Sequence, residues 1–166
     1  PIGGKPILWH IMKGYAQYGF NHFVIALGYK SAVIKNYFLD YNKLSTDLTI
    51  SIGNENIESN SKRTEKWTVE LLDTGLDNNT GKRVQLLAQH INEPFMLTYG
   101  DGVCNVDIEQ LVKFHNNHGK LATLTAVRPP ARFGEVKIQN SQVIKFAEKP
   151  QTSSDWINGG FFGLNP

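Results

Sequence analysis

The clearest candidates for chemistry are short polar motifs that follow apolar runs. Gly100-Asp101-Gly102 comes directly after the apolar run 95–99, so its carboxylate would project from the end of a rigid strand. The flanking glycines carry no side chains, which lets a phosphate or a hydrated metal ion come close. Mg²⁺ takes one or two carboxylates together with phosphate oxygens. The tripeptide therefore indicates either a magnesium site on Asp101 or an ordinary tight turn, in which Asp and Gly are also favoured.

A second candidate is the start of an expected helix, Thr80-Gly81-Lys82-Arg83. Cations are disfavoured in the first turn of a helix. Two adjacent ones, Lys82 and Arg83, suggest that an anion arrives at the free N–H groups there. The alternative is that both are solvated surface residues after a polar loop.

Two later motifs carry groups that suit a phosphorylated sugar. Glu148 and Lys149 close an expected strand. A Glu can accept hydrogen bonds from sugar hydroxyls, and a Lys can meet a phosphate as a point charge. Asn158 precedes two glycines, which again allows close approach of a ligand. The alternative for Glu148 and Lys149 is an ordinary solvated ion pair, and the alternative for Asn158 and its glycines is a simple turn.

These motifs need a framework of helices and strands, and hydrophobic spacing predicts one. Ser31 and Asp107 are expected as N-caps, and 53–66 is expected as a polar loop. The expected helices lie at 6–18, 31–38, 80–91 and 107–118, and the expected strands at 23–27, 48–52, 69–72, 95–99, 122–127 and 160–164, with a hairpin made by 136–138 and 143–146.

The alternation of strands and helices predicts an α/β fold with a mainly parallel sheet. The late hairpin adds antiparallel strands, so the sheet is expected to be mixed. Ligands of such sheets bind beyond the carboxyl ends of the strands. That rule directs attention to Gly28, Gly75, the Asp101 tripeptide and Glu148.

Composition sets the outer bounds. The 166 residues suit a single domain, and the net charge of +2 comes without a dense basic face, so nucleic acid is not an expected partner. The sequence contains no run of 18 apolar residues, so no membrane-spanning helix is expected. Cys104 is the only cysteine, so no internal disulfide is possible and a cytoplasmic setting is expected.

The order of the motifs resembles that of the sugar-phosphate nucleotidylyltransferases. The stretch from Trp67 to Arg83 is most similar to the branch that transfers a cytidylyl group to glucose 1-phosphate. The motifs that carry the resemblance are Ile2-Gly3-Gly4-Lys5-Pro6-Ile7-Leu8, Thr98-Tyr99-Gly100-Asp101-Gly102, Arg132-Phe133-Gly134, Glu148-Lys149-Pro150 and Asn158-Gly159-Gly160-Phe161-Phe162.

The resemblance implies a Rossmann-like three-layer αβα nucleotidyltransferase fold. It also implies a reaction in which CTP and α-D-glucose 1-phosphate give CDP-glucose and pyrophosphate, with Mg²⁺ as cofactor. Residues 1–166 would form a partial domain, truncated at both ends, without the family's N-terminal Gly-rich loop and its C-terminal part.

Roles follow for individual positions that match the family's motifs. Asp101 is expected to bind Mg²⁺ and, with Lys149, to be catalytic. The nucleotide would be bound by Thr80, Gly81, Arg83 and Gly100. The sugar phosphate would be bound by Gly134, Glu148, Lys149 and Asn158.

Two other functions fit the same residues. A metal-dependent glycosyltransferase also uses carboxylates at a strand end. A catalytically inactive subunit would bind a sugar nucleotide for regulation, without turnover. In either case we expect a homo-oligomer, with the polar segment 53–66 long enough to reach a neighbouring copy.

Overall fold

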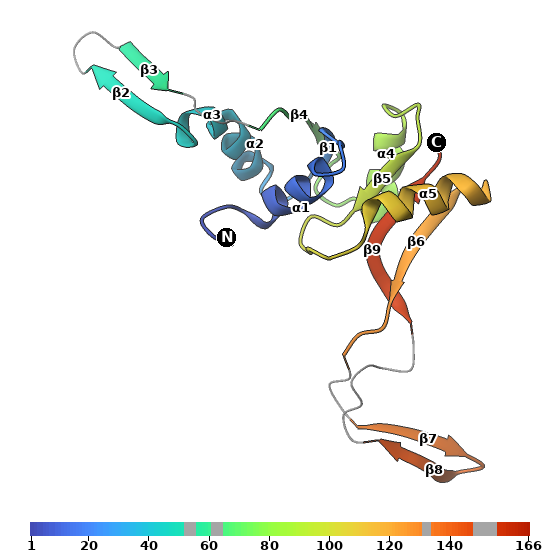
Figure 1. Ribbon diagram of the computed structural model, residues 1–166. Coiled ribbons are helices and arrows are strands. Elements are labelled where there is room, and N and C mark those ends of the chain that lie inside the picture. The colour runs from blue at the N-terminus through green and yellow to red at the C-terminus, as the bar shows by residue number, and fades with distance from the viewer. Residues whose placement is uncertain (52–55, 61–64, 131–133, 148–155) are drawn as a thin grey trace. The chain divides into compact units, whose positions relative to one another are not determined.

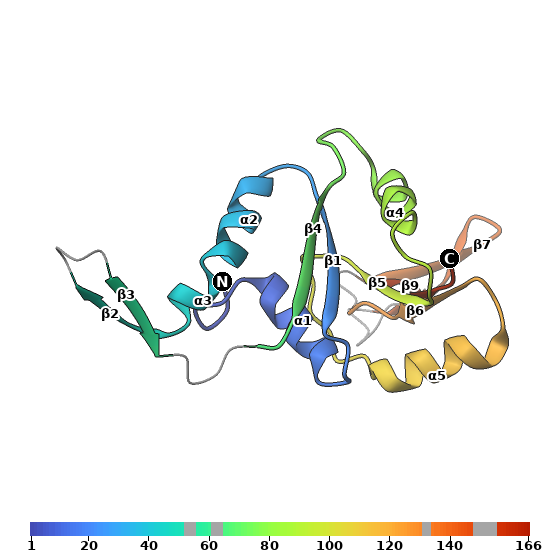
Figure 2. The ribbon, with the colours of Figure 1, turned by 90° about the horizontal axis from the view of Figure 1, so that it is seen from above.

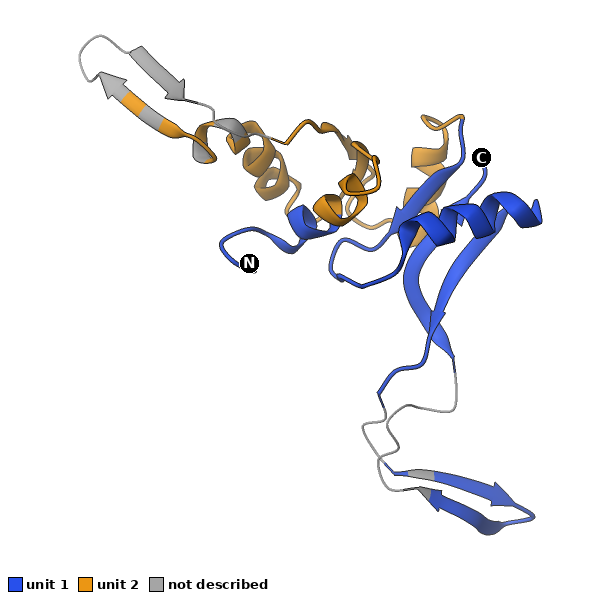
Figure 3. Cartoon of the chain, viewed as in Figure 1, with its two compact units in different colours: residues 1–11, 93–166 blue, residues 12–92 orange. Residues whose placement is uncertain are grey.

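The computed structural model describes the chain except at 52–55, 61–64, 131–133 and 148–155 (Figure 1). The chain divides into two compact units (Figure 3). Unit 1 contains residues 1–11 and 93–166, and unit 2 contains residues 12–92. No helix within the described ranges has the length and apolar character needed to cross a membrane.

Unit 2 is built on two parallel strands that run side by side, β1 and β4 (Figure 2). Helix α1 enters the unit, which also contains the helices α2, α3 and α4 and a further pair of strands described below. The pairing starts at His22 with Thr68 and ends at Leu27 with Asp73, so both strands finish at one edge. The elements are α1 (Ile7–Ala16), β1 (His22–Leu27), α2 (Ser31–Leu39), α3 (Tyr41–Leu44), β4 (Thr68–Asp73) and α4 (Thr80–Ala88).

The apolar spacing seen in the sequence produces the core of unit 2. Met12 and Tyr15 come from one face of α1, Leu27 ends β1, and Leu87 lies on α4; all four side chains are buried. Leu27 is fully shielded from solvent, at 0% exposure, which anchors the strand end that carries the polar groups described below.

Two expectations about unit 2 are wrong. Ser31 is not the N-cap of α2: the cap is Lys30, in the left-handed region with φ 57°, and it makes no side-chain cap bond. The Ser31 N–H donates to Gly28 O at 3.1 Å, so a tight turn already satisfies it. The expected loop 53–66 contains a strand, β3 (Asn56–Asn60), which pairs with β2 (Asp47–Ser51). Backbone hydrogen bonds form this ladder, so a polar sequence does not prevent it.

Unit 1 contains a three-stranded sheet of order β5-β9-β6. Both pairings of the central strand β9 are antiparallel. The strands are β5 (Phe95–Thr98), β6 (Ala122–Val127) and β9 (Ile157–Leu164), and helix α5 (Ile108–His118) lies between β5 and β6 in the chain.

The two sequence signals for α5 are confirmed. Asp107 accepts a hydrogen bond from the Gln110 N–H at 3.0 Å and caps the helix. Gly119, with φ 65°, ends it in the left-handed conformation that glycine adopts without strain. The expected hairpin is also present as β7 (Glu135–Gln139) and β8 (Gln142–Ala147), joined by Asn140 and Ser141, both with positive φ.

The alternation of helices and strands is confirmed, but the expected mixed, mainly parallel sheet is not seen within the described residues, where each sheet is parallel or antiparallel throughout. There, only β1 and β4 pair in parallel. The chain leaves β6, forms the β7–β8 hairpin and returns as β9, which reverses its direction beside both β5 and β6.

A closed ring of hydrogen bonds joins α5 to β6 and to the end of the chain. Thr123 Oγ1 lies 2.8 Å from His115 Nδ1 and 2.5 Å from His118 Nε2. His115 Nε2 contacts Asn165 Oδ1 at 3.1 Å. The Lys120 N–H donates to His118 Nδ1 and the Lys120 carbonyl accepts from Asn165 Nδ2. Every proton in this ring finds one acceptor when both histidines are neutral, with Nε2 protonated.

We expect Thr123→Val to lower the free energy of unfolding by about 1–3 kcal/mol, because His115 would lose a partner inside the protein. His115 is 4% exposed, so water cannot replace the hydroxyl. Urea unfolding measures the change. Thr125→Val is the matched control on the same strand: the Thr125 hydroxyl has no hydrogen-bond partner among the described residues, so its loss should cost under about 0.5 kcal/mol. Equal losses for the two variants would contradict the ring.

Candidate active site

Asp101 lies in unit 1, in the turn that follows β5. Its side chain is exposed. A Cβ atom added to Gly100 or to Gly102 would meet nothing within 4 Å. The carboxylate is therefore presented at a strand end with open space on both sides, as the sequence predicts.

The described residues contain no group of three or more His, Cys, Asp or Glu side chains that could hold a metal ion. Asp101 could therefore serve only a metal that takes most of its ligands from elsewhere. Mg²⁺ does this, since it commonly binds one or two carboxylates and completes its shell with water and phosphate oxygens. The exposed carboxylate and its open surroundings fit that ion.

Asn158 is the second residue of β9 on the same unit, at an irregularity in the pairing with β6. Asn158 pairs with Ala126, but the next pair joins Phe162 to Leu124, so β9 carries extra residues there. Such a bulge turns side chains away from the regular pleat. The Asn158 amide is exposed, and it is held by Tyr99 Oη at 3.1 Å and by the Gly160 N–H at 2.8 Å.

Gly134, a further predicted sugar-phosphate residue, is half-buried and immediately precedes β7. Glu148 and Lys149 lie outside the described residues. Asp101, Gly100, Gly134 and Asn158 thus belong to unit 1, whereas Thr80, Gly81 and Arg83 belong to unit 2.

In unit 2 the Arg83 side chain ties together the ends of β1 and β4. Arg83 Nη1 donates to Leu27 O at 3.0 Å and to Thr74 Oγ1 at 2.5 Å, and Nη2 donates to Leu76 O at 3.1 Å. Thr74 is buried and donates both its N–H and its hydroxyl to Leu27 O. Arg83 is therefore not simply a solvated surface residue, because these donors are directed at protein carbonyls and a hydroxyl. The arrival of an anion at the first turn of α4 stays a prediction.

Gly28 leaves the space that the Arg83 guanidinium occupies. A Cβ at position 28 would come within 2.6 Å of Arg83 Nη2 and 2.7 Å of Nη1. The sequence places Gly28 at a strand end but gives no sign that it accommodates an arginine 55 residues further on. The parallel pairing of β1 with β4, together with the turn that leads from β4 to α4, brings the two positions together.

The segment between β4 and α4 is also fixed by its own side chains. The Gly75 N–H donates to Asp73 Oδ1 at 2.9 Å, and Asn78 Nδ2 donates to Thr74 O at 2.6 Å. The N-cap of α4 is Asn79, whose Oδ1 accepts from the Lys82 N–H at 2.9 Å. Thr80 and Gly81 follow it as exposed residues of the first turn. This ordered turn presents their backbone at the edge where β1 and β4 end.

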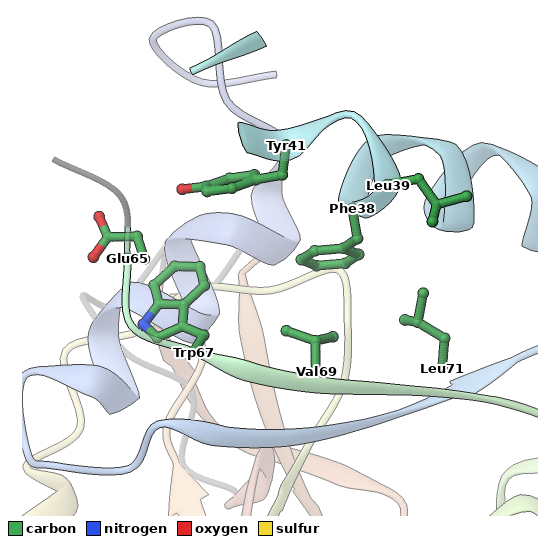
Figure 4. A pocket seen from close by; sticks show the side chains of 7 residues that line it. All are labelled: Phe38, Leu39, Tyr41, Glu65, Trp67, Val69 and Leu71. Carbon is green, nitrogen blue, oxygen red and sulfur yellow. The ribbon is translucent and has the colours of Figure 1, made fainter. Parts of the chain in front are cut away.

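Unit 2 also contains a pocket that the sequence did not indicate. It has a volume of about 340 Å³ and lies between α2, α3 and β4 (Figure 4). Glu65 at its rim forms an ion pair with Lys13 at 3.0 Å. Tyr37 directly precedes the lining residue Phe38, and burial together with the neighbouring Tyr41 raises the pKa of Tyr37 to about 12. The lining residues are Phe38, Leu39, Tyr41, Glu65, Trp67, Val69 and Leu71, none of which is a predicted site residue.

Comparison with known proteins gives consistent results. The whole chain, residues 1–166, matches the profile of the family described as Nucleotidyl transferase. It is 50% identical over 167 aligned residues to glucose-1-phosphate cytidylyltransferase of Salmonella typhi, and 49% identical to that of Salmonella typhimurium. Each alignment covers 99% of this chain and 65% of the relative, so the chain spans less than two thirds of the length of these relatives.

More distant proteins are similar over nearly the whole of this chain. Mannose-1-phosphate guanylyltransferase catalytic subunit beta of Xenopus tropicalis is 28% identical over 98% of this chain and 42% of its own length. The crystal structure of HddC from Yersinia pseudotuberculosis matches with a TM-score of 0.61 at 19% identity, covering 99% of this chain and 65% of that one. Its complex with GMP-PN gives a TM-score of 0.62.

Proposed function

The chain belongs to the nucleotidyl transferase family, and from this premise we propose that the protein transfers a cytidylyl group from CTP to α-D-glucose 1-phosphate. The products are CDP-glucose and pyrophosphate. The observation that carries the choice of substrates is the 50% identity, over 99% of the chain, to a glucose-1-phosphate cytidylyltransferase. Transfer of a guanylyl group to mannose 1-phosphate is less favoured, because the guanylyltransferase with that name is only 28% identical to this chain.

The reaction forms one bond and breaks one. An oxygen of the sugar phosphate attacks the α-phosphorus of CTP, and the bond from that phosphorus to the departing pyrophosphate breaks. No covalent enzyme intermediate is needed, so positioning and charge compensation supply most of the acceleration. Both substrates are anionic, and bringing them together is the main obstacle.

In this proposal Asp101 holds Mg²⁺ at the end of β5, where the open space beside Gly100 and Gly102 admits phosphate oxygens. When bound, the ion offsets negative charge that would otherwise oppose the approach of the two substrates. Lys149, as a second cation, and Glu148 are assigned to the sugar phosphate by the resemblance of their motif. Asn158 offers its amide to a sugar hydroxyl.

On the nucleotide side we propose that Thr80 and Gly81 meet the base through the first turn of α4. Arg83 supports this by holding the ends of β1 and β4 through its bonds to Leu27 O and Thr74 Oγ1. Its contribution to nucleotide binding is thus made through the shape of the turn.

We also propose that residues 1–166 form part of one Rossmann-like three-layer αβα nucleotidyltransferase domain. The support is the alternation of helices and strands and the structural likeness to HddC over 99% of the chain.

The test is a pyrophosphate-release assay of the full-length protein with glucose 1-phosphate, Mg²⁺ and each of CTP, UTP, GTP and ATP. We expect the specificity constant for CTP to exceed the others by at least about 100-fold, because a site that hydrogen-bonds one base leaves polar groups unpaired with another. A preference for another nucleotide would reject the cytidylyl assignment. Binding of CDP-glucose without any pyrophosphate release would favour the inactive, regulatory alternative.

A further inference from the structure

Tyr99 occupies a position that connects the Asp101 turn with the start of β9. It leaves β5 directly after the last β5–β9 pair, Thr98 with Phe161, and stands two residues before Asp101. Its ring lies against Gly160, where an added Cβ would come within 2.9 Å of Tyr99 Cδ2. The ring also packs edge-on against Phe162, with centroids 6.0 Å apart.

Gly160 is shaped to receive that ring. It is buried and has φ 78°, a conformation that residues with a side chain rarely adopt. Thr98 Oγ1 donates to Gly160 O at 2.9 Å, which joins the end of β5 to the same residue. The position of the Tyr99 ring is therefore determined by both strands.

The phenol group of Tyr99 completes the support of the Asn158 side chain. Asn158 Nδ2 donates to Tyr99 Oη at 3.1 Å, and Asn158 Oδ1 accepts from the Gly160 N–H at 2.8 Å. Both ends of the amide are thus held, which fixes its plane. One N–H and one lone pair remain for a ligand, and the side chain is exposed.

We propose that Tyr99 is a positioning residue for the sugar phosphate: its hydroxyl orients the Asn158 amide toward a sugar hydroxyl of glucose 1-phosphate. This inference rests on the proposed function, in which Asn158 contacts the sugar. Because Tyr99 acts through Asn158, its hydroxyl matters for the sugar phosphate and not for CTP.

The decisive variant is Tyr99→Phe in the full-length protein. It removes the hydroxyl and keeps the ring on Gly160. We expect the KM for glucose 1-phosphate to rise roughly 5- to 20-fold, the effect of losing one oriented hydrogen bond. The KM for CTP and kcat should change by less than about twofold, because uniform binding of one substrate is what is lost. Tyr18→Phe is the matched control: Tyr18 is 44% exposed, against 43% for Tyr99, and lies in unit 2.

A double-mutant cycle separates a positioning role from a direct one. In an Asn158→Ala background, Tyr99→Phe should add less than about a twofold change in the KM for glucose 1-phosphate, since its target is gone. Full additivity, or a change in the KM for CTP, would overturn the inference.

A measurement without turnover distinguishes this inference from the function on which it rests. In NMR spectra of the ligand-free protein, Tyr99→Phe should shift the side-chain amide signals of Asn158, and glucose 1-phosphate should shift the same signals in the wild type. If glucose 1-phosphate does not bind the wild type, the proposed function and the sugar role fail together. If it binds both proteins equally and the Asn158 signals are unmoved by Tyr99→Phe, the inference about Tyr99 alone is overturned.

Discussion

Asp101→Asn in the full-length protein is expected to reduce pyrophosphate release from CTP and glucose 1-phosphate by at least about 100-fold. The substitution keeps the size of the side chain and removes the negative charge that would hold Mg²⁺. Asp101 is exposed and is flanked by open space at Gly100 and Gly102, so the fold should be unaffected. Steady-state rates at increasing Mg²⁺ measure the loss, and calorimetry with Mg²⁺ measures binding directly.

Asp107→Asn is the matched control for this experiment. Asp107 is the N-cap of α5, and asparagine caps helices about as well as aspartate. The control should retain the rate of the wild type. Turnover by Asp101→Asn at the same level as the control would remove Asp101 from the metal site.

The second large effect is expected at Gly28. In Gly28→Ala the new methyl group would come within 2.6 Å of Arg83 Nη2, so the guanidinium must leave. Its bonds to Leu27 O, Thr74 Oγ1 and Leu76 O would be lost with it. We expect kcat/KM for CTP to fall roughly 10- to 100-fold, because the turn that presents Thr80 and Gly81 loses its support. Steady-state kinetics with CTP as the varied substrate measures the change.

The mechanism of that loss can be tested with Arg83→Ala. If Gly28→Ala acts by displacing Arg83, the double variant should be no worse than Arg83→Ala alone. Gly14→Ala is the control: it lies within α1, has nothing within 4 Å of the added Cβ, and should leave kcat/KM unchanged. Additive losses from Gly28→Ala and Arg83→Ala would contradict the displacement.

Much of the fold follows from local patterns. Helix α5 could be placed from its Asp107 cap and its Gly119 stop because both act within one turn of the chain. The hairpin at Asn140 and Ser141 could be placed for the same reason. Strand β3 could not, since a polar segment pairs through backbone groups that hydrophobic patterning does not report.

The direction of the strands could not be predicted from local signals either. Parallel pairing was expected from the alternation of helices and strands, but the path of the chain from β6 to β9 makes both pairings of β9 antiparallel.

The expectation of a homo-oligomer stays a prediction, as do the roles of Glu148 and Lys149.

The candidate site divides in the same way. Asp101 and Asn158 stand out in the sequence because each is an isolated polar side chain beside glycines. Tyr99 does not, since an aromatic residue at a strand end reads as core. The role of Arg83 could not be predicted from the sequence either. Its side chain binds the backbone carbonyl of Leu27, which is distant in the chain, and the hydroxyl of Thr74.

The most direct test of the account follows the atoms of glucose 1-phosphate. The full-length protein is incubated with CTP, Mg²⁺ and glucose 1-phosphate that carries ¹⁸O in the bridge between C1 and phosphorus, and the products are identified by mass spectrometry. We expect CDP-glucose that retains the heavy oxygen, together with unlabelled pyrophosphate, because the sugar phosphate attacks through a phosphate oxygen and its C1–O bond stays intact. Loss of the label from the sugar nucleotide, or the absence of CDP-glucose, would contradict it.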